Sequence, residues 1–353
     1  MARSLTARRA AAAFVSALLL LGTAACGGGS DEKGSGDGTS GEGASRDSAF
    51  PVTIPHKFGE AKIPAEPKRI VTLGLTDQDA VLAAGKVPVG TMDWIGGFEG
   101  AVGPWAQDEL GSATVPTVLK DTGTGAQIEK VAALDPDLIV AVYGGLTKEQ
   151  YRTLSKFAPV VAQPAKYQDY GVPWQEQATI VGKAVGGSEA AAKAVADVEA
   201  RIAAAARPEF ENATAVMGTP YEGIFLYGSQ DPRSRLLTDL GFSLPAGLDK
   251  AIGGKFGANI SKERTDLLDQ DAVVWMLGDV EKDGAKLRED PSYGGLKAVK
   301  EGREVYIHET SDYGYAATFG TVLSLPYVLD RLVPQLTAAV DGKPETKVEQ
   351  PAS

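Results

Sequence analysis

The chain has 353 residues, of which 43% are hydrophobic, and carries a formal charge of −11. This length suits two domains rather than one, and the apolar content is enough for sizeable cores. The acidic charge argues against a nucleic-acid partner. The single cysteine, Cys26, excludes a disulfide within the chain and any cysteine-based metal cluster.

Residues 1–25 have the features of a secretory signal peptide. Three arginines precede an apolar stretch over residues 10–21, which is too short to span a bilayer as a stable helix. Small residues then lead to Cys26, and the whole resembles a bacterial lipoprotein signal, although Thr23 stands where that motif has Leu, Val or Ile. We expect cleavage before Cys26 and a lipid on its thiol. The alternative is an ordinary secretory signal that leaves a free thiol.

Residues 26–49 predict a flexible tether. Gly, Ser, Thr, Asp and Glu dominate this stretch, which contains no aromatic residue. Such a composition cannot bury enough apolar surface to fold. The protein is therefore expected on the extracytoplasmic face of the cell membrane, held there by its lipid anchor.

Residues 50–187 predict a first α/β lobe, because short apolar strands alternate with helices. The strands are expected at residues 68–74, 87–94, 136–145 and 159–164. The helices are expected at residues 76–85, 122–134, 147–158 and 174–185. Thr76 with Asp79, and Thr147 with Gln150, have the spacing of a capping box.

Residues 188–207 predict one long helix between two lobes. The segment is rich in alanine, begins at Ser188 as a cap, and ends before Pro208. At 1.5 Å per residue it would be roughly 28 Å long. A bridge of this kind resists bending, so we expect a small closure of the lobes on ligand binding.

Residues 208–340 predict a second α/β lobe of the same kind. Strands are expected at residues 214–219, 223–228, 272–277 and 304–308, and helices at residues 234–241, 262–268, 293–300 and 319–336. The last helix contains or begins at Pro326. Residues 341–353 are expected to form a loose polar tail.

A phrase repeated in the two halves supports this architecture. The stretch EKVAALDPDLIVA begins at Glu129, and ERTDLLDQDAVVW begins at Glu263. Each has Glu, five residues, Asp, one residue, Asp, and then an apolar run. The turns alone are common, but the shared Glu and strand indicate the same helix–turn–strand unit in two similar lobes. We therefore predict two α/β lobes joined by one rigid helix, with a ligand cleft between them.

The chain lacks the motifs of the common catalytic sites. It has no Walker motif, no Gly-x-Ser-x-Gly elbow and only two histidines, His56 and His308. We expect His56 to be exposed and His308 to be structural. An extracellular body without a catalytic constellation favours binding over catalysis, so the protein is predicted not to be an enzyme and to have no cofactor or metal site of its own.

Five segments together resemble the ferric-siderophore-binding lipoproteins of bacterial ABC importers, relatives of the iron-hydroxamate and vitamin B12 binding proteins. They are KRIVTLGLTDQDAVLAAG, IEKVAALDPDLIVA, YRTLSKFAPVV, DLLDQDAVVWML and LKAVKEGREVYI. The resemblance covers residues 50–336 in order. It implies a periplasmic-binding-protein fold of two lobes bridged by a long helix, and delivery of the ligand to a membrane permease that a separate ATPase drives. We expect a monomer.

The resemblance also implies a role for the repeated glutamate. Proteins of this family dock on the permease through an acidic residue on each lobe, and Glu129 and Glu263 stand at the matching positions. An exposed carboxylate can form a charge-assisted pair with a permease arginine. A solvated surface Glu remains the alternative for each.

Candidate ligand-binding residues follow from strand ends, because ligands of α/β folds bind at the carboxyl ends of the strands. The candidates are Trp94, Tyr143, Tyr170, Trp174, Tyr227, Arg233, Tyr313 and Tyr315. The same loops hold Phe98, Trp105, Arg235 and Phe319, and Arg235 can also pair locally. The resemblance implies aromatic faces against the siderophore and Arg or Tyr donors toward the iron-binding oxygens. Core packing is the alternative for each aromatic residue.

The expected ligand is a ferric hydroxamate of the ferrioxamine type. Such a complex is neutral or cationic, whereas a catecholate complex carries several negative charges and the expected cleft loops offer few basic residues. The same fold could instead bind cobalamin or haem. An extracellular enzyme on an α/β scaffold is a further alternative, which turnover of a substrate would reveal.

Overall fold

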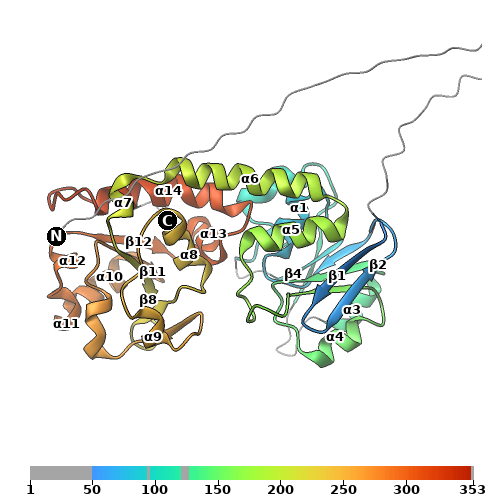
Figure 1. Ribbon diagram of the computed structural model, residues 1–353, viewed down its shortest axis with the longest axis horizontal. Helices are drawn as coiled ribbons and strands as arrows, with labels where there is room; N and C mark the ends of the chain where they lie inside the picture. The colour runs from blue at the N-terminus through green and yellow to red at the C-terminus, as the bar shows by residue number, and fades with distance from the viewer. Residues whose placement is uncertain (1–49, 94–95, 121–126, 351–353) are drawn as a thin grey trace, which may run out of the picture. The chain divides into compact units, whose positions relative to one another are not determined.

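The computed structural model describes residues 50–93, 96–120 and 127–350 of the chain (Figure 1). These residues belong to one compact unit, Asp47–Ser353. The expected signal peptide, tether and lipidated Cys26 lie outside the described residues. Within the unit, two five-stranded sheets form the α/β fold that the sequence predicts.

The first sheet is parallel throughout and has the strand order β5-β4-β3-β6-β7. Its strands are β3 (Ile70–Thr72), β4 (Gly90–Met92), β5 (Thr117–Leu119), β6 (Leu138–Ala141) and β7 (Val160–Ala162). Their side chains are mostly buried, as expected of a sheet with helices on both faces. The helices are α1 (Asp77–Ala83), α2 (Gln107–Leu110), α3 (Ile128–Ala133), α4 (Lys148–Leu154) and α5 (Trp174–Val185), with short 3₁₀ turns η1 (Glu99–Ala101) and η2 (Pro104–Ala106).

Of the two expected capping boxes, the one at Thr147 is present and the one at Thr76 is not. Thr147 caps α4 in a full capping box, since its hydroxyl accepts from the Gln150 backbone N–H and the Gln150 side chain accepts from the Thr147 backbone N–H. The box expected at Thr76 is wrong, because Thr76 makes no side-chain cap to α1. Its hydroxyl accepts from Gln177 instead, and Asp79 is used elsewhere in the fold.

A hairpin that the sequence did not predict precedes the first sheet. Strand β1 (Val52–His56) pairs antiparallel with β2 (Gly59–Ile63). The expectation of an exposed His56 is wrong, because only 6% of the residue is exposed. Its ring packs edge-on against Tyr151, 5.1 Å away between centroids, and burial lowers the pKa of its imidazole.

The second sheet has the order β10-β9-β8-β11-β12 and mixes directions. Its strands are β8 (Ala215–Thr219), β9 (Phe225–Tyr227), β10 (Gly257–Asn259), β11 (Ala272–Leu277) and β12 (Glu304–His308). Strand β9 runs antiparallel to both of its neighbours, β8 and β10, and the other pairs are parallel. Its helices are α7 (Pro208–Glu211), α8 (Pro232–Asp239), α9 (Leu248–Ile252), η3 (Lys262–Leu267), α10 (Val280–Glu289), α11 (Pro291–Gly294), α12 (Lys297–Lys300) and α13 (Asp312–Phe319).

The long bridging helix is present as α6 (Ser188–Ala205), and α14 (Ser324–Ala339) runs beside it (Figure 1). An ion pair between Arg201 of α6 and Asp330 of α14 joins the two helices. Ser188 does not cap α6, which takes Gly187 as its cap residue. The closing helix begins at Ser324 rather than at residue 319, and Pro326 is its third residue, where no intrahelical N–H bond is needed.

The C-terminal segment, which was expected to be loose from residue 341 onward, is bound to the second lobe at Val348 and Gln350. The side-chain oxygen of Gln350 accepts from the Tyr306 backbone N–H at 2.7 Å, and its amide group donates to the Glu304 carbonyl. Val348 packs against the core of the second lobe. Bonds to β12 therefore hold a segment that composition alone assigned to solvent.

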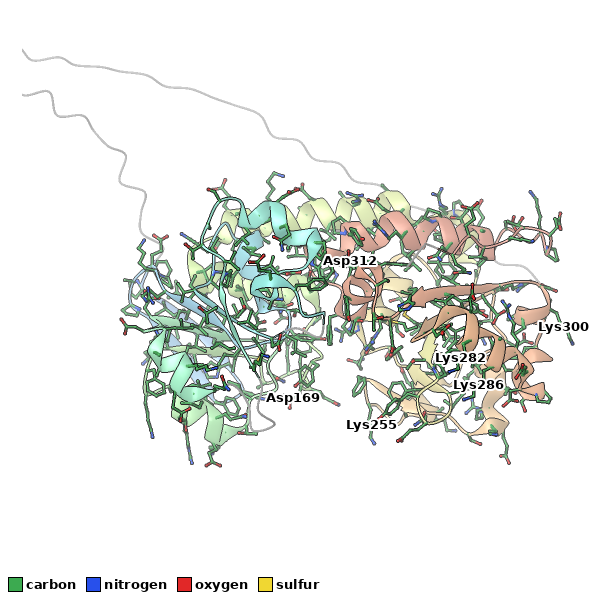
Figure 2. All side chains as sticks on the ribbon, turned by 180° about the vertical axis from the view of Figure 1, so that it is seen from behind. Asp169, Lys255, Lys282, Lys286, Lys300 and Asp312 are labelled. Carbon is green, nitrogen blue, oxygen red and sulfur yellow. The ribbon has the colours of Figure 1, made fainter. Side chains whose placement is uncertain are left out.

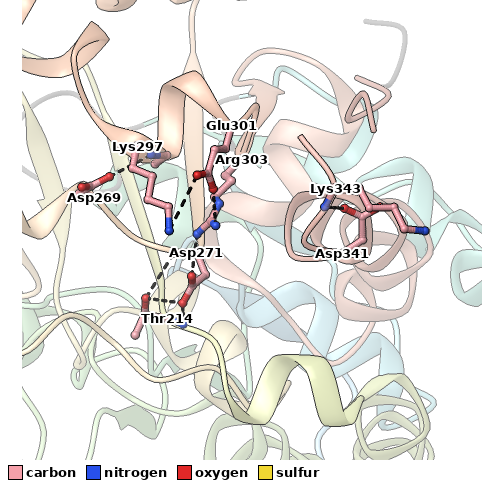
Figure 3. A network of polar contacts seen from close by, with 9 residues as sticks. Thr214, Asp269, Asp271, Lys297, Glu301, Arg303, Asp341 and Lys343 are labelled. Carbon is pink, nitrogen blue, oxygen red and sulfur yellow. Dashed lines mark hydrogen bonds and ion pairs between the residues drawn. The ribbon is translucent and has the colours of Figure 1, made fainter. Parts of the chain in front are cut away.

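The repeated phrase forms the same unit in both lobes. Glu129 is the second residue of α3, and Glu263 is the second residue of the 3₁₀ helix η3. Asp137 accepts from the backbone N–H groups of Lys68 and Arg69, just before β3. Asp271 accepts from the backbone N–H and hydroxyl of Thr214, just before β8 (Figure 3).

The shared unit has a structural reason. In each lobe the second aspartate ties the start of its own strand to the start of the neighbouring strand, β6 to β3 and β11 to β8. In the second lobe Arg303 adds an ion pair of 2.7 Å to Asp271 (Figure 3). The aspartate thus sets the strand register, and the glutamate is left on the preceding helix.

Candidate functional site

A pocket of about 180 Å³ lies where loops of the two lobes meet. The first lobe contributes Tyr143, which follows β6, and Trp174, which begins α5. The second lobe contributes Arg235 of α8 and Phe319 of α13. Strand-end reasoning thus located two residues, Tyr143 and Trp174, that line a pocket between the lobes.

Tyr143 is held in a fixed position in this pocket. Its backbone N–H donates to Asp77 of α1 at 3.1 Å, and Asp77 also accepts from Gln177 of α5 at 2.7 Å. The Tyr143 ring packs edge-on against Tyr170, 5.6 Å away, and against Phe319 of the second lobe, 5.7 Å away. Two expected residues, Tyr143 and Tyr170, therefore form one aromatic cluster with Phe319.

Arg233 of α8 is not among the residues that line the pocket, and its guanidinium is held by its neighbours. Its Nε donates to Asp231 Oδ1 at 2.8 Å and its Nη2 donates to Oδ2 at 2.9 Å, in a bidentate pair. Its guanidinium lies over the ring of Tyr227, with 3.6 Å between the guanidinium carbon and the ring centroid. Asp231 itself caps α8 by accepting from the Arg233 backbone N–H.

The hydroxyls of Tyr143 and Tyr227 share the field of this ion pair. Burial raises the pKa of both phenols, the Asp231 carboxylate raises both further, and Arg233 opposes the shift. Both hydroxyls are therefore protonated at neutral pH and can donate hydrogen bonds. Tyr143 belongs to the first lobe and Tyr227 to the second. The charges of Asp231 and Arg233 therefore act on one tyrosine hydroxyl from each lobe.

The charges in this region balance. Arg233 is matched by Asp231. Arg235 lines the pocket together with Asp239. Burial raises the pKa of the Asp239 carboxyl, and the positive charge of Arg235 partly opposes this rise. Arg235 also donates to the carbonyl of Gly171 in the first lobe at 3.0 Å. The site therefore offers hydrogen-bond donors without a large excess of positive charge.

A second group of aromatic residues joins the lobes. Phe98 of the first lobe packs edge-on against Tyr315 of α13 at 5.5 Å and against Trp105 at 5.6 Å. The indole N–H of Trp105 donates to Asp79 at 2.8 Å. Tyr315 thus lies at the contact between the lobes, and its contact with a ligand stays a prediction.

One expected ligand residue, Tyr313, is not brought to the site. Tyr313 is 4% exposed, and its hydroxyl donates to Gln335 of α14 inside the core of the second lobe. It points away from Tyr315 because residues two positions apart on a helix do not face the same side. Trp94 lies outside the described residues.

The expected docking residues are both available. Glu129 and Glu263 are exposed, and within the described ranges neither carboxylate forms an ion pair. Each lies in the first turn of its helix, where the backbone N–H groups favour a negative charge.

A larger cavity of about 490 Å³ lies within the second lobe alone. Ile224, Lys262, Lys286 and Tyr293 are among its lining residues, and it contains no predicted ligand residue. Lys286 lies beside Lys282 on the surface of this lobe (Figure 2). Among the described residues no group of His, Cys, Asp and Glu could hold a metal ion, and no helix is long and apolar enough to cross a membrane.

Comparison with known proteins agrees with this arrangement. The model of the periplasmic binding protein family matches residues 71–310, which include both sheets almost entirely and the bridging helix. The chain belongs to the periplasmic binding protein family. The family consists of solute-binding proteins rather than enzymes, so the chain is a binding protein with two α/β domains.

Three relatives illustrate the similarity. The putative ABC transporter substrate-binding lipoprotein YhfQ of Bacillus subtilis is 29% identical, over 72% of this chain and 80% of its own. The Fe(3+)-citrate-binding protein YfmC of the same organism is 26% identical, over 82% and 87%. The structure of PiaA of Streptococcus pneumoniae in complex with ferrichrome is 27% identical, covers 82% of this chain and 98% of its own, and superposes with a TM-score of 0.71.

Two residues of this region were missed by the sequence analysis. Asp231 was visible as an acidic residue before Pro232 at a helix start, which is a common N-cap pattern. Nothing in the local pattern indicated that its carboxylate also binds Arg233. Asp79 was assigned to a capping box, but its side-chain partners are Trp105 and Thr321, which lie 26 and 242 residues away in the sequence.

Proposed function

We propose that this binding protein captures a ferric siderophore of the hydroxamate class and delivers it to the permease of an ABC importer. The relatives support an iron complex as the ligand, since one is named for ferric citrate and another was solved with ferrichrome. The ligand would lie between the lobes, against Tyr143, Tyr170, Trp174, Tyr227, Arg233 and Tyr315.

The balance of charge in the site is the observation that favours a hydroxamate. Asp231 occupies both Nε and Nη2 of Arg233, and Asp239 accompanies Arg235. A complex with several negative charges would need uncompensated cations to replace its hydration. A neutral ferric trihydroxamate needs hydrogen-bond donors instead, which the protonated hydroxyls of Tyr143 and Tyr227 would supply.

The size of the pocket indicates how the ligand would be held. Pockets that enclose whole drug-sized ligands span about 300 to 1,000 Å³. The pocket of about 180 Å³ would therefore receive one arm or edge of the complex. The exposed part of Tyr170 and the ring of Tyr315 would contact the rest.

Delivery would use one acidic residue of each lobe, Glu129 and Glu263, against basic residues of the permease. Support comes from their exposure, their lack of ion-pair partners within the described residues and their matching places in α3 and η3. Lipid attachment at Cys26 would hold the protein on the extracytoplasmic face of the membrane, as a monomer.

Ligand titration tests this proposal. The body from Asp47 onward would be titrated by intrinsic fluorescence with ferrioxamine B, ferrichrome, ferric dicitrate, a ferric catecholate, haem and cobalamin. We expect saturable quenching by the hydroxamates with a dissociation constant below about 1 μM. Tighter binding of ferric dicitrate or the catecholate would overturn the hydroxamate assignment, and binding of haem or cobalamin alone would overturn the siderophore assignment.

A further inference from the structure

The carboxyl of Asp79 is buried at the contact between the two lobes, although its helix α1 belongs to the first lobe. The residue is 1% exposed. Its Oδ2 accepts from the indole N–H of Trp105 and from the hydroxyl of Thr321, which belongs to the second lobe. Its Oδ1 has no hydrogen-bond partner among the described residues. A buried carboxyl with so few donors is costly, so its position calls for a role.

Thr321 connects this carboxyl to the helix that supplies ligand-facing side chains. The residue lies between α13 and α14, two positions after Phe319, which lines the pocket. Its hydroxyl accepts from the Ser324 backbone N–H at 2.9 Å, and its own backbone N–H donates to the Ser324 hydroxyl at 2.8 Å. Ser324 in turn donates to the carbonyl of Ala316 in α13. Asp79 thus fixes the end of α13 to the first lobe.

Trp105 makes the same connection through packing. Its ring lies against the core cluster of the second lobe and also against the small cluster around Leu82 and Val102 of the first. It contacts Tyr327 of α14 at 6.3 Å and Phe98 at 5.6 Å between ring centroids. The bond to Asp79 holds this ring in the orientation that both lobes use.

Two hydrogen bonds to loop carbonyls also join the lobes. Gln168 donates to the carbonyl of Gly254 at 3.3 Å, and Arg235 donates to that of Gly171 at 3.0 Å. Both involve flexible side chains and loop carbonyls, and the Gln168 contact is exposed. Asp169 and Lys255 lie in these same two loops, one in each lobe (Figure 2).

From these contacts we infer that Asp79 is a positioning residue, which with Trp105 and Thr321 forms the fixed pivot of the two lobes. The loop contacts at Gly171 and Gly254 separate and re-form as ligand enters and leaves, whereas the three-residue junction stays closed. The angle between the lobes, and so the distance between Tyr143 and Tyr227, depends on the Thr321 hydroxyl. The bridging helix α6 alone does not set it.

Distance measurement between the lobes tests this inference without any ligand. The body from Asp47 onward contains no cysteine, so Lys148→Cys in α4 and Lys286→Cys in α10, both at exposed positions, can carry spin labels for pulsed electron resonance. Thr321→Val removes the hydroxyl at nearly constant volume, and Thr321→Ser keeps it. We expect one narrow distance distribution for the parent and for Thr321→Ser, and a broadened or shifted one for Thr321→Val.

Trp105→Phe is a second, independent variant, which removes the indole donor and keeps an aromatic ring. It should also broaden or shift the distance distribution, as Thr321→Val does. Near-ultraviolet circular dichroism checks that each variant is folded. A folded Thr321→Val and a folded Trp105→Phe with the parent distribution would overturn the inference. Because these distances are measured on the free protein, that failure is distinct from a failure to bind siderophore.

Ligand affinity supplies a second measurement for the same variants. Loss of a hydrogen bond to a buried carboxyl that aligns the cleft should weaken ferrioxamine B binding by about tenfold in Thr321→Val. Thr321→Ser should restore the affinity. If Thr321→Val bound ferrioxamine B as the parent does, Thr321 would have no positioning role. If the parent itself did not bind, the proposed function would fail and the distance measurement would still decide the pivot.

Discussion

Asp231 and Arg233 lie two residues apart and face each other through two hydrogen bonds of 2.8 and 2.9 Å. The arginine is therefore not a bare cation awaiting an anionic ligand. It is half of a neutral pair, and its guanidinium is stacked on the ring of Tyr227. The proposed preference for an uncharged ligand rests on this pairing, so a change in the pairing should alter it.

Asp231→Asn should change the charge preference of the site. The variant leaves Arg233 uncompensated, and one unit of charge acting over about 8 Å at an effective dielectric constant near 20 is worth about 2 kcal/mol, or roughly thirtyfold. We expect the affinity for ferric dicitrate to rise relative to that for ferrioxamine B, measured by paired fluorescence titrations. Asp279→Asn is the matched control, since Asp279 is also a helix N-cap but lies on α10. An unchanged ratio in Asp231→Asn would contradict the charge argument.

Replacement of both docking carboxylates should separate binding from uptake. The double variant Glu129→Ala, Glu263→Ala should bind ligand as the parent does, because both residues are exposed and lie outside the pocket. Transport of labelled ferric siderophore into cells should fall strongly. Glu149→Ala with Glu281→Ala is the control, since these are also first-turn glutamates, one in each lobe. Normal uptake by the Glu129, Glu263 variant would refute the docking role.

Tyr313→Phe should affect stability and leave ligand binding unchanged. The Tyr313 hydroxyl donates to Gln335 inside the core, so its loss should lower the free energy of unfolding by about 1 kcal/mol. Tyr227→Phe should weaken ferrioxamine B binding, because we propose that the Tyr227 hydroxyl donates to the ligand. Urea unfolding and ferrioxamine B titration of the two variants check this pair, and a Tyr313→Phe variant with weakened binding would return Tyr313 to the cleft.

The Asp79 carboxyl should make the stability of the protein depend on pH. Burial raises its pKa from 3.8 to about 6, against the opposing effect of its bonds to Thr321 and Trp105. The folded state then binds a proton more tightly than the unfolded state. This contribution is full below pH 3.8 and is lost as the pH rises through 6, with a size of about 3 kcal/mol.

Asp79→Asn isolates this effect, because the amide oxygen can still accept both hydrogen bonds and cannot titrate. Unfolding free energies from urea titrations at pH 4, 5, 6 and 7 should show the parent losing stability relative to Asp79→Asn as the pH rises. Asp77 is the second carboxyl of α1 with a pKa raised to about 6 by burial. It is present in both proteins, so it cancels in the difference. A constant difference across the series would contradict the assignment to Asp79.

Local patterns were enough to predict the elements whose signals lie within a few residues. The capping box at Thr147 and Gln150 fixed the start of α4, and Gly186 ends α5 in a left-handed conformation as a helix C-cap should. The repeated phrase located two equivalent units because each aspartate makes a bond to the adjacent strand. The family and the two-lobed fold that the sequence suggested are confirmed by the family match.

Features that depend on long-range contacts could not be predicted in the same way. Tyr313 and Tyr315 are both tyrosines in the segment that follows β12, and nothing in the local sequence distinguishes them. Only the packing of α13 on α14 turns Tyr313 toward the core and Tyr315 toward Phe98. The tail looked polar and free, but Gln350 binds the exposed edge of β12. The ligand and docking roles of the individual residues stay predictions.

The continuity of each sheet in the sequence has a consequence for how the protein folds. All strands of the first sheet lie between residues 70 and 162, and all strands of the second between residues 215 and 308. As the chain emerges from its N-terminus, the first sheet can therefore complete its pairing before the second has appeared. Thr321 follows Asp79 by 242 residues, so the contact that aligns the lobes forms last, and the binding cleft exists only when the chain is nearly whole.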